Sequence, residues 1–384
     1  MRFLHTSDWH VGKTLKGHDR LPEQREVLAE IVRVARDHRV DAVLVAGDLY
    51  ETATPGAEAQ QLVVGTLLAL RDTGARVIAI AGNHDHAPTL DAYRPLAGAA
   101  GITLVGRVRR PADGGVVAFE AASDSSPVRV AALPFLSQRY AVRAAELLSQ
   151  TPAESSAGYD AWVRGIIGAL ARGFDPGAVN VVLTHLTVTG AAFGGGERQA
   201  QSIFEYHVPA AAFPAEAHYV ALGHLHRRQS VPAACPVHYS GSPLRVDFGE
   251  TESEPVVLLV EATPDTPARV TDVRITSARR LRTLRGTLAE LSTLDVDPDD
   301  LVKVVVTEPA RAGLREDVQE LLPNALEVHV ERPAPAQRRP AERARTDRAP
   351  GELLHDFLAS RDVADPRVEA LFARLHDEVL AGEG

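Results

Sequence analysis

The chain has 384 residues, a length that favours two or three domains rather than one. Its 45% hydrophobic and 24% charged residues are typical of a globular protein that buries cores of ordinary size. A formal net charge of −10 argues against nucleic-acid binding over the whole surface. It leaves room for a local basic groove or for phosphate binding through metal ions.

Cysteine content and hydropathy indicate the cellular compartment. Cys235 is the single cysteine, which excludes an internal disulfide and a zinc cluster built from cysteines. The sequence contains neither a signal peptide nor an apolar run of about twenty residues. We therefore expect a cytoplasmic protein with no membrane partner.

Strands and helices alternate in the first part of the chain. Helical spacing of apolar residues predicts helices at 22–38 and 55–73. Short apolar runs predict buried strands at 1–8, 41–46, 76–81, 180–185 and 219–226, followed by strands at 236–243 and 255–262. This alternation predicts an α/β fold with a layered core over residues 1–262.

The remainder of the sequence predicts a second, smaller unit, a linker and two C-terminal helices. A second unit, α+β in class, is expected at 263–332, with a helix at 313–322 and strands at 269–275, 301–307 and 326–330. Residues 333–350 form a linker rich in proline and arginine. Apolar residues at helical spacing predict two C-terminal helices within 351–384, and their place beyond a linker favours docking on a partner.

Polar side chains follow five of the predicted strands directly. Ligands of open α/β sheets gather outside the carboxyl ends of strands, so we expect these side chains to converge. Imidazole, carboxylate and amide donors together suit a pair of cations such as Mn²⁺ or Fe²⁺. The five groups are Asp8-x-His10, Gly47-Asp48, Asn83-His84-Asp85, His185 and His224-x-His226.

This donor set predicts phosphoryl-transfer chemistry. Paired ions about 3.5–4 Å apart can hold the attacking and leaving oxygens of an in-line displacement. Asp48 stands alone on its strand and is the candidate bridging ligand. His84 is then left to protonate the leaving oxygen, and Asp85 is a candidate to orient its ring. The sequence thus predicts an enzyme that transfers phosphoryl groups with the help of two metal ions.

The same motifs resemble those of the calcineurin-like metallophosphoesterases. Within them, His5-Thr-Ser-Asp-Trp-His-Val-Gly-Lys13, Gly223-His-Leu-His226 and Tyr239-Ser-Gly-Ser-Pro243 are similar to the SbcD nuclease-subunit family. The resemblance implies a four-layer β-sandwich flanked by helices, a small capping domain that recognises DNA, and C-terminal helices. It also implies a role for each site residue: one metal on Asp8, His10, Asp48 and His226, the other on Asp48, Asn83, His185 and His224, and His84 as the catalytic acid.

The resemblance further implies what the protein acts on. Family members are Mn²⁺-dependent exonucleases and endonucleases that cut double-stranded DNA ends and hairpins in DNA repair, recombination and replication. They work as a homodimer with an SMC-like ATPase of the SbcC type, on which the C-terminal helices would dock. This chain departs from the family pattern at His86, where a small residue is usual, and at Glu51, where aspartate is common. Neither departure removes a ligand.

Some assignments keep an alternative. We expect the basic loop that holds Lys13, Lys16, His18 and Arg20 to contact DNA phosphates, although each can be a plain surface group. One alternative function is that of a phosphoesterase for nucleotides or other small substrates. The expected capping domain and the C-terminal helices argue against it. The intact His84 and the full ligand set argue against a non-catalytic DNA-end-binding scaffold.

Overall fold

The computed structural model describes the chain except for residues 138–151, 196–206, 252, 332–349, 362–365 and 383–384. The chain divides into two compact units, 1–332 and 333–384. Of the linker expected at 333–350, residues 333–349 lie outside the described residues, and Pro350 is described.

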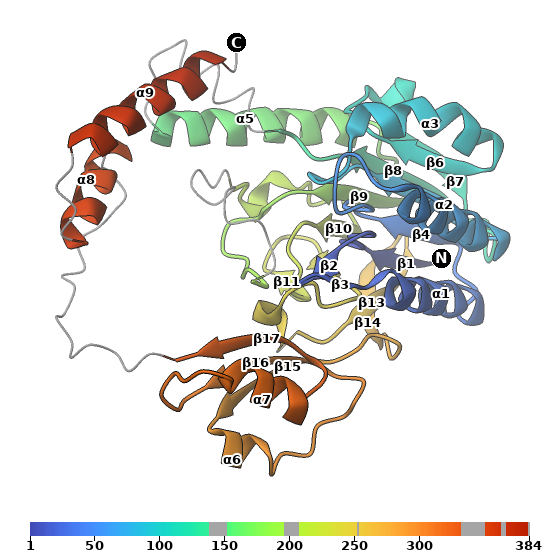
Figure 1. Cartoon of the computed structure of the whole chain (residues 1–384). Helices are drawn as coiled ribbons and strands as arrows, with labels where there is room; N and C mark the ends of the chain where they lie inside the picture. The colour runs from blue at the N-terminus through green and yellow to red at the C-terminus, as the bar shows by residue number, and fades with distance from the viewer. Residues whose placement is uncertain (138–151, 196–206, 252, 332–349, 362–365, 383–384) are drawn as a thin grey trace. The chain divides into compact units, whose positions relative to one another are not determined.

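Two six-stranded sheets form the centre of the first unit (Figure 1). In the first sheet the strand order is β14-β13-β1-β4-β5-β6. The middle strands run parallel, and β13 pairs antiparallel with β1, with Phe3 opposite Val260. The bounds are β1 Arg2–Thr6, β4 Ala42–Val45, β5 Arg76–Ile80, β6 Ile102–Val105, β13 Val256–Thr263 and β14 Thr266–Arg274.

The second sheet has the order β11-β12-β10-β9-β8-β7, with parallel strands in the middle and antiparallel edges. Its strands are β7 Val116–Glu120, β8 Pro127–Leu133, β9 Val179–His185, β10 Tyr219–Gly223, β11 Gln229–Val231 and β12 Val237–Tyr239. Alternate side chains of most strands in the two sheets enter a shared core, because burying both apolar faces removes them from water. This core includes Phe3, Leu44, Ile78, Val130, Val181 and Tyr219.

Helices cover the outer faces of both sheets. On the first sheet lie α1 Leu21–Asp37, α2 Ala57–Asp72 and α3 Ala87–Ala99, and on the second lies α5 Pro152–Ala171. Helix α1 buries Val27, Ile31 and Ala35, which are spaced along one face. The order helix, sheet, sheet, helix confirms the predicted four-layer α/β sandwich. Helix α3 was not predicted, because Pro95 inside it interrupts the helical pattern.

Short elements complete the first unit. Strands β2 Thr14–Leu15 and β3 His18–Asp19 form a hairpin in the basic loop after β1. Single turns of 3-10 helix are η1 Pro111–Asp113, η3 Ala210–Ala212 and η4 Phe248–Glu250.

The smaller sheet contains three parallel strands. They are β15 Leu281–Gly286, β16 Leu301–Val306 and β17 Ala325–Val330, covered by α6 Leu288–Leu291 and α7 Leu314–Leu321. The strand expected at 269–275 was assigned to this sheet wrongly: it is β14, which pairs with β13 in the first large sheet. The proline-containing stretch after Thr263 is a tight hairpin that joins β13 to β14. The division into domains at 262 and 332 stays a proposal.

The second unit contains α8 Pro350–Ser360 and α9 Pro366–Gly382, the two helices predicted near the C-terminus. Phe357, Leu371 and Leu375 are exposed on them. Among the described helices, none is long and apolar enough to cross a membrane.

Candidate metal centre

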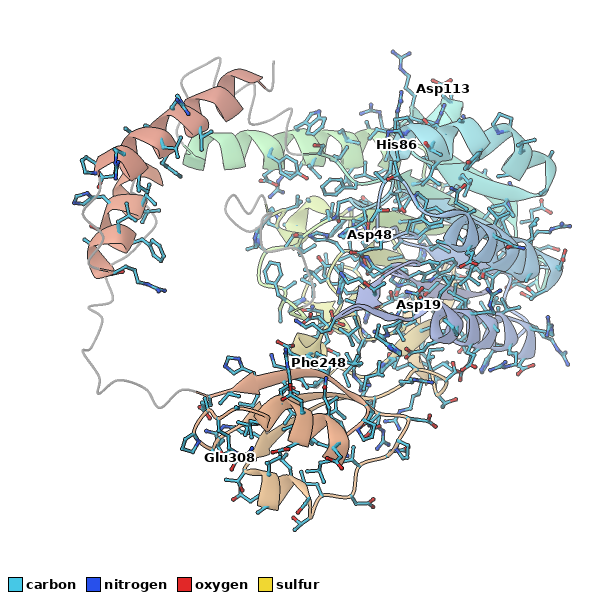
Figure 2. The ribbon with its side chains drawn as sticks, in the orientation of Figure 1. Asp19, Asp48, His86, Asp113, Phe248 and Glu308 are labelled. Carbon is cyan, nitrogen blue, oxygen red and sulfur yellow. The ribbon has the colours of Figure 1, made fainter. Side chains whose placement is uncertain are left out.

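Five strands deliver their polar ends to one edge of the sandwich. Asp8 and His10 follow β1, Asp48 follows β4, Asn83 and His84 follow β5, His185 ends β9, and His224 and His226 follow β10. Six of these eight side chains are buried, and those of Asn83 and His224 are partly buried. Figure 2 shows Asp48 in the interior of the first unit, near the two large sheets. The expected convergence of the eight residues is therefore observed.

One group of donors surrounds His10. Its Nε2 atom lies 3.0 Å from Nε2 of His226 and 3.6 Å from Oδ2 of Asp48. Donor atoms of Asp8, His10 and His226 all lie within 4.8 Å of one another. Three side chains from two strand ends are thus close enough to share one cation.

A second group lies on the other side of Asp48. The same Oδ2 atom of Asp48 lies 3.5 Å from Nε2 of His185. Asn83 places its Oδ1 atom 2.8 Å from both His185 Nε2 and His224 Nδ1. Because Asp48 borders both groups, it occupies the position that a bridging ligand needs.

The protonation of these side chains suits divalent cations. Burial lowers the pKa of His10 to about 3 and holds that of His185 well below its ordinary value, so both rings are neutral and offer a lone pair. Burial, together with the charges of Asp85 and Asp8, raises the pKa of Asp48. Crowded carboxylates beside neutral imidazoles are stabilised by bound cations, and this mixed nitrogen and oxygen set fits divalent first-row transition metals.

Two glutamates orient the rings of the first group. The His10 Nδ1 atom lies 2.9 Å from Oε2 of Glu51, and the His226 Nδ1 atom lies 2.6 Å from Oε1 of Glu250. Such a bond selects the tautomer whose Nε2 faces the centre. Sequence reasoning did not assign this role to either glutamate, because Glu250 lies 24 positions beyond His226 and only the fold brings them together.

His84 lies beside the first group. Its backbone N–H donates to Oδ1 of Asp48 at 2.8 Å, and its ring Nδ1 donates to the carbonyl oxygen of Glu51 at 2.7 Å. The ring meets that of His10 edge to face, with centroids 4.6 Å apart. With Nδ1 engaged in this way, Nε2 is the atom at which the ring gains or loses its second proton.

The expectation that Asp85 orients His84 is wrong. The Asp85 carboxylate accepts hydrogen bonds from the backbone N–H groups of Gly82, Tyr50 and Leu49, at 2.9, 3.0 and 3.2 Å. It therefore ties the loop after β5 to the loop after β4. The carbonyl of Glu51, which is delivered by that second loop, orients the ring instead.

The backbone at this edge adopts unusual conformations. Asp8, His10, Asp48 and His224 all have positive φ angles, of 55°, 46°, 52° and 99°. Such angles are uncommon outside glycine and persist where the surrounding structure enforces them, often at functional sites. Gly82 allows the close approach of two loops, because a Cβ atom there would collide with the carboxylate and backbone nitrogen of Asp48.

Comparison with known proteins decides the family. The family model described as calcineurin-like phosphoesterase matches residues 1–228. The chain belongs to this family. The SbcD subunit of the nuclease SbcCD from Bacillus subtilis (strain 168) is 38% identical over 285 residues, which cover 73% of this chain and 71% of that protein. The corresponding subunit from Escherichia coli (strain K12) is 29% identical over 296 residues, 76% of this chain and 72% of that one.

A second family model covers the smaller sheet of this phosphoesterase. It is described as type 5 capsule protein repressor C-terminal domain and matches residues 277–362. Its match begins a few residues before β15, in agreement with the observed start of the smaller sheet at Leu281. The resemblance to the SbcD family that the motifs indicated is confirmed.

The basic loop of this phosphoesterase packs partly on its own neighbours. Lys13 forms an ion pair with Glu51 at 2.9 Å, and the exposed Lys16 forms one at 3.2 Å with Glu327 on β17. His18 is partly buried in β3. Lys13, Lys16 and His18 stay predicted DNA contacts.

Arg20 does not fit that prediction. Its side chain is almost wholly buried, with 1% of the residue exposed. Its guanidinium donates to both carboxylate oxygens of Glu23, at 2.9 Å each, and to the carbonyl oxygen of Arg245. A buried guanidinium with these partners cannot reach a DNA phosphate, so its assignment as a DNA contact is wrong.

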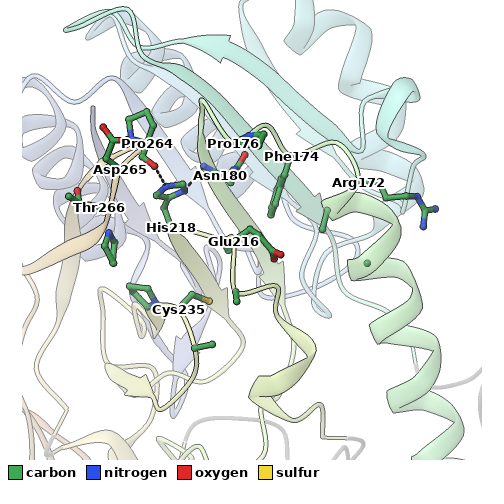
Figure 3. A pocket seen from close by; sticks show the side chains of 17 residues that line it. Arg172, Phe174, Pro176, Asn180, Glu216, His218, Cys235, Pro264, Asp265 and Thr266 are labelled. Atoms are coloured by element: carbon green, nitrogen blue, oxygen red, sulfur yellow. Dashed lines mark hydrogen bonds between the residues drawn. The ribbon is translucent and has the colours of Figure 1, made fainter.

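A cavity of about 650 Å³ lies away from the metal centre (Figure 3). The described residues that line it include none of the predicted site residues. Its His218 ring accepts the backbone N–H of Asn180 at 3.0 Å and donates to the carbonyl oxygen of Pro264 at 2.8 Å. Both ring nitrogens are thus used in holding neighbouring segments together.

Proposed function

We propose that the protein is a two-metal-dependent DNA phosphodiesterase that cuts double-stranded ends and hairpins, as an exonuclease and endonuclease in DNA repair and recombination. The observation that carries this proposal is the position of Asp48 between two clusters of buried and partly buried donors. The description of its relatives as subunits of a nuclease supports a nucleic acid as the substrate, and the motifs similar to the SbcD family imply DNA.

Each cluster is assigned one ion, with Mn²⁺ as the preferred metal. One ion would be held by Asp8, His10, Asp48 and His226, and the other by Asp48, Asn83, His185 and His224. When bound, such a pair of cations supplies Lewis acidity at the phosphate and lowers the pKa of a coordinated water. The orientation of the rings by Glu51 and Glu250 favours this assignment.

His84 is assigned the proton transfer. The backbone of His84 is held by Asp48 and its ring by the carbonyl of Glu51, so the ring has a defined place beside the donor clusters. Its Nε2–H would protonate the 3′ oxygen as that oxygen leaves phosphorus, a role in which an imidazole is effective near neutral pH.

The remaining parts are assigned roles in assembly. The smaller sheet would cap the site and recognise DNA, together with Lys13, Lys16 and His18. The exposed apolar residues of α8 and α9 suit docking on an ATPase of the SbcC type, the partner that the description of the relatives implies. The working unit would be a homodimer in the cytoplasm.

The test is a cleavage assay on hairpin and blunt-ended DNA with Mn²⁺, with and without the SbcC-type ATPase and ATP. We expect cleavage of both substrates that stops when the metal is chelated. Turnover of mononucleotide esters far above DNA cleavage would instead indicate a small-molecule phosphoesterase. DNA binding without any cleavage in the presence of Mn²⁺, ATP and the partner would indicate a scaffold.

A further inference from the structure

The turn η4 connects the metal centre to another part of the molecule. At its end, Glu250 is 1% exposed and holds the ring of His226 through Oε1, at 2.6 Å. Its second oxygen, Oε2, accepts the backbone N–H of Val246 at 2.8 Å. The carboxylate therefore has a fixed orientation, and any displacement of η4 moves the atom that orients His226.

The start of the same turn packs on the smaller sheet. Phe248 is 7% exposed and belongs to one buried cluster with Leu15, Leu281 and Leu301. Leu281 begins β15 and Leu301 begins β16. Figure 2 shows Phe248 between the smaller sheet and the rest of the first unit.

The cluster also reaches the loop that carries another candidate ligand. Leu15 lies in the hairpin that follows His10, and Lys16 beside it forms the ion pair with Glu327 of the smaller sheet. His10 and His226 belong to the same donor group. The hairpin and the turn η4, which pack against the smaller sheet, are thus connected to the donor group of Asp8, His10 and His226.

We infer that η4 transmits the position of the smaller sheet to the metal centre, with Glu250 as a positioning residue for His226. This inference rests on the proposed two-metal function. Because η4 is a single turn, Phe248 and Glu250 cannot move independently by more than a small amount. When the smaller sheet packs on Phe248, His226 keeps the orientation that a metal ligand needs. Displacement of the sheet selectively weakens the binding of the ion assigned to the group of Asp8, His10 and His226.

The first experiment removes the orienting charge. Glu250→Gln keeps the size of the side chain, and bound Mn²⁺ is counted from the loss of the free-ion EPR signal during titration of the full chain. We expect one of two ions to bind about 10- to 100-fold more weakly, the cost typical of losing an outer-shell partner. Glu254→Gln is the matched control, because Glu254 is an exposed carboxylate four positions along that pairs with Arg274.

The second experiment changes the packing between the smaller sheet and η4. Leu301→Ala opens a cavity against Phe248, whereas Leu314→Ala makes the same change in the core between the smaller sheet and its helices, which does not include Phe248. The two leucines are 3% and 2% exposed, so similar losses of stability are expected, measured by urea unfolding. We expect Leu301→Ala, but not Leu314→Ala, to lower the affinity for the same Mn²⁺ ion that Glu250→Gln binds more weakly. Phe248→Leu serves the same purpose should Leu301→Ala fail to fold.

The outcomes separate the inference from the proposed function. Wild-type protein that binds fewer than two Mn²⁺ ions would overturn the two-metal function itself. Wild-type protein that binds two ions, with Glu250→Gln unchanged in affinity, would overturn the role of Glu250 alone. Equal Mn²⁺ affinities for the Leu301 and Leu314 variants would show that the smaller sheet does not act on the centre.

Discussion

The ring Nδ1 of His84 and the backbone carbonyl oxygen of Glu51 lie 2.7 Å apart. The residue that orients the candidate acid is therefore the one whose carboxylate orients His10. Because the bond to His84 uses the backbone, substitution of the Glu51 side chain leaves that acceptor in place. The proposed metal binding and the proposed proton transfer are thus expected to be separable by mutation.

Replacement of His84 by alanine tests the proton donor. We expect His84→Ala to bind two Mn²⁺ ions and DNA as the wild type does, while cleavage falls by about 10²- to 10⁴-fold, the usual contribution of a general acid. EPR counting of bound Mn²⁺ and single-turnover cleavage are the measurements. His86→Ala, which removes an exposed ring bonded to Thr89, is the control and should cut normally. Loss of both ions from His84→Ala would show that His84 is a ligand.

Replacement of Asp48 tests the bridge. Asp48→Ala removes the carboxylate that lies between both donor groups and the acceptor for the His84 N–H. We expect neither ion to bind at micromolar Mn²⁺ when the metal content is measured after gel filtration. A variant that retains one full equivalent would mean that Asp48 serves a single ion.

Asp85 gives a prediction about stability. Asp85→Ala leaves three backbone N–H groups without their acceptor, and we expect a loss of about 3 kcal/mol in the free energy of unfolding. Urea unfolding of metal-free protein measures this loss without interference from bound ions. Asp72→Ala, at an exposed position at the end of α2, should change stability by less than about 0.5 kcal/mol. An equally small effect of Asp85→Ala would contradict the role of a clamp between loops.

Glu30 lies away from the metal centre, and we expect it to make the free energy of unfolding depend on pH. Burial acts to raise its pKa, but hydrogen bonds from the hydroxyl and backbone N–H groups of Ser277 and Thr276 bring the pKa below the ordinary value of 4.5. A carboxylate whose pKa is lower in the folded state stabilises the fold fully above pH 4.5, and this contribution is lost as pH falls through the folded-state pKa.

The corresponding experiment measures the free energy of unfolding against pH for Glu30→Gln and for wild type. We expect the variant to be less stable near neutral pH, with the difference shrinking as the pH is lowered past 4.5. Glu26→Gln, exposed on the same helix, should show no such trend. A difference that stays constant down to low pH would mean that the charge of Glu30 contributes nothing.

The sheet topology could be predicted only in part. Strands with long apolar runs, such as β5 and β9, were predicted close to their observed bounds because burial on both faces leaves a continuous apolar signal. Strand β14 was assigned to the wrong sheet, because its mostly exposed residues carry no sign of which partner it will pair with. The short β15 was missed for a similar reason, since only some of its residues are buried.

By itself, the sequence determined which polar side chains gather at one edge, because each of them follows directly on an apolar strand and the ends of parallel strands meet there. Only the tertiary structure decided what supports those donors. Asp85 and Arg20 look like site residues in the sequence, yet their hydrogen bonds hold loops together. Glu51 and Glu250 orient histidines that lie 41 and 24 positions away. The physical reason is that a side chain's role depends on the partners that folding brings to it, and these partners are distant in sequence.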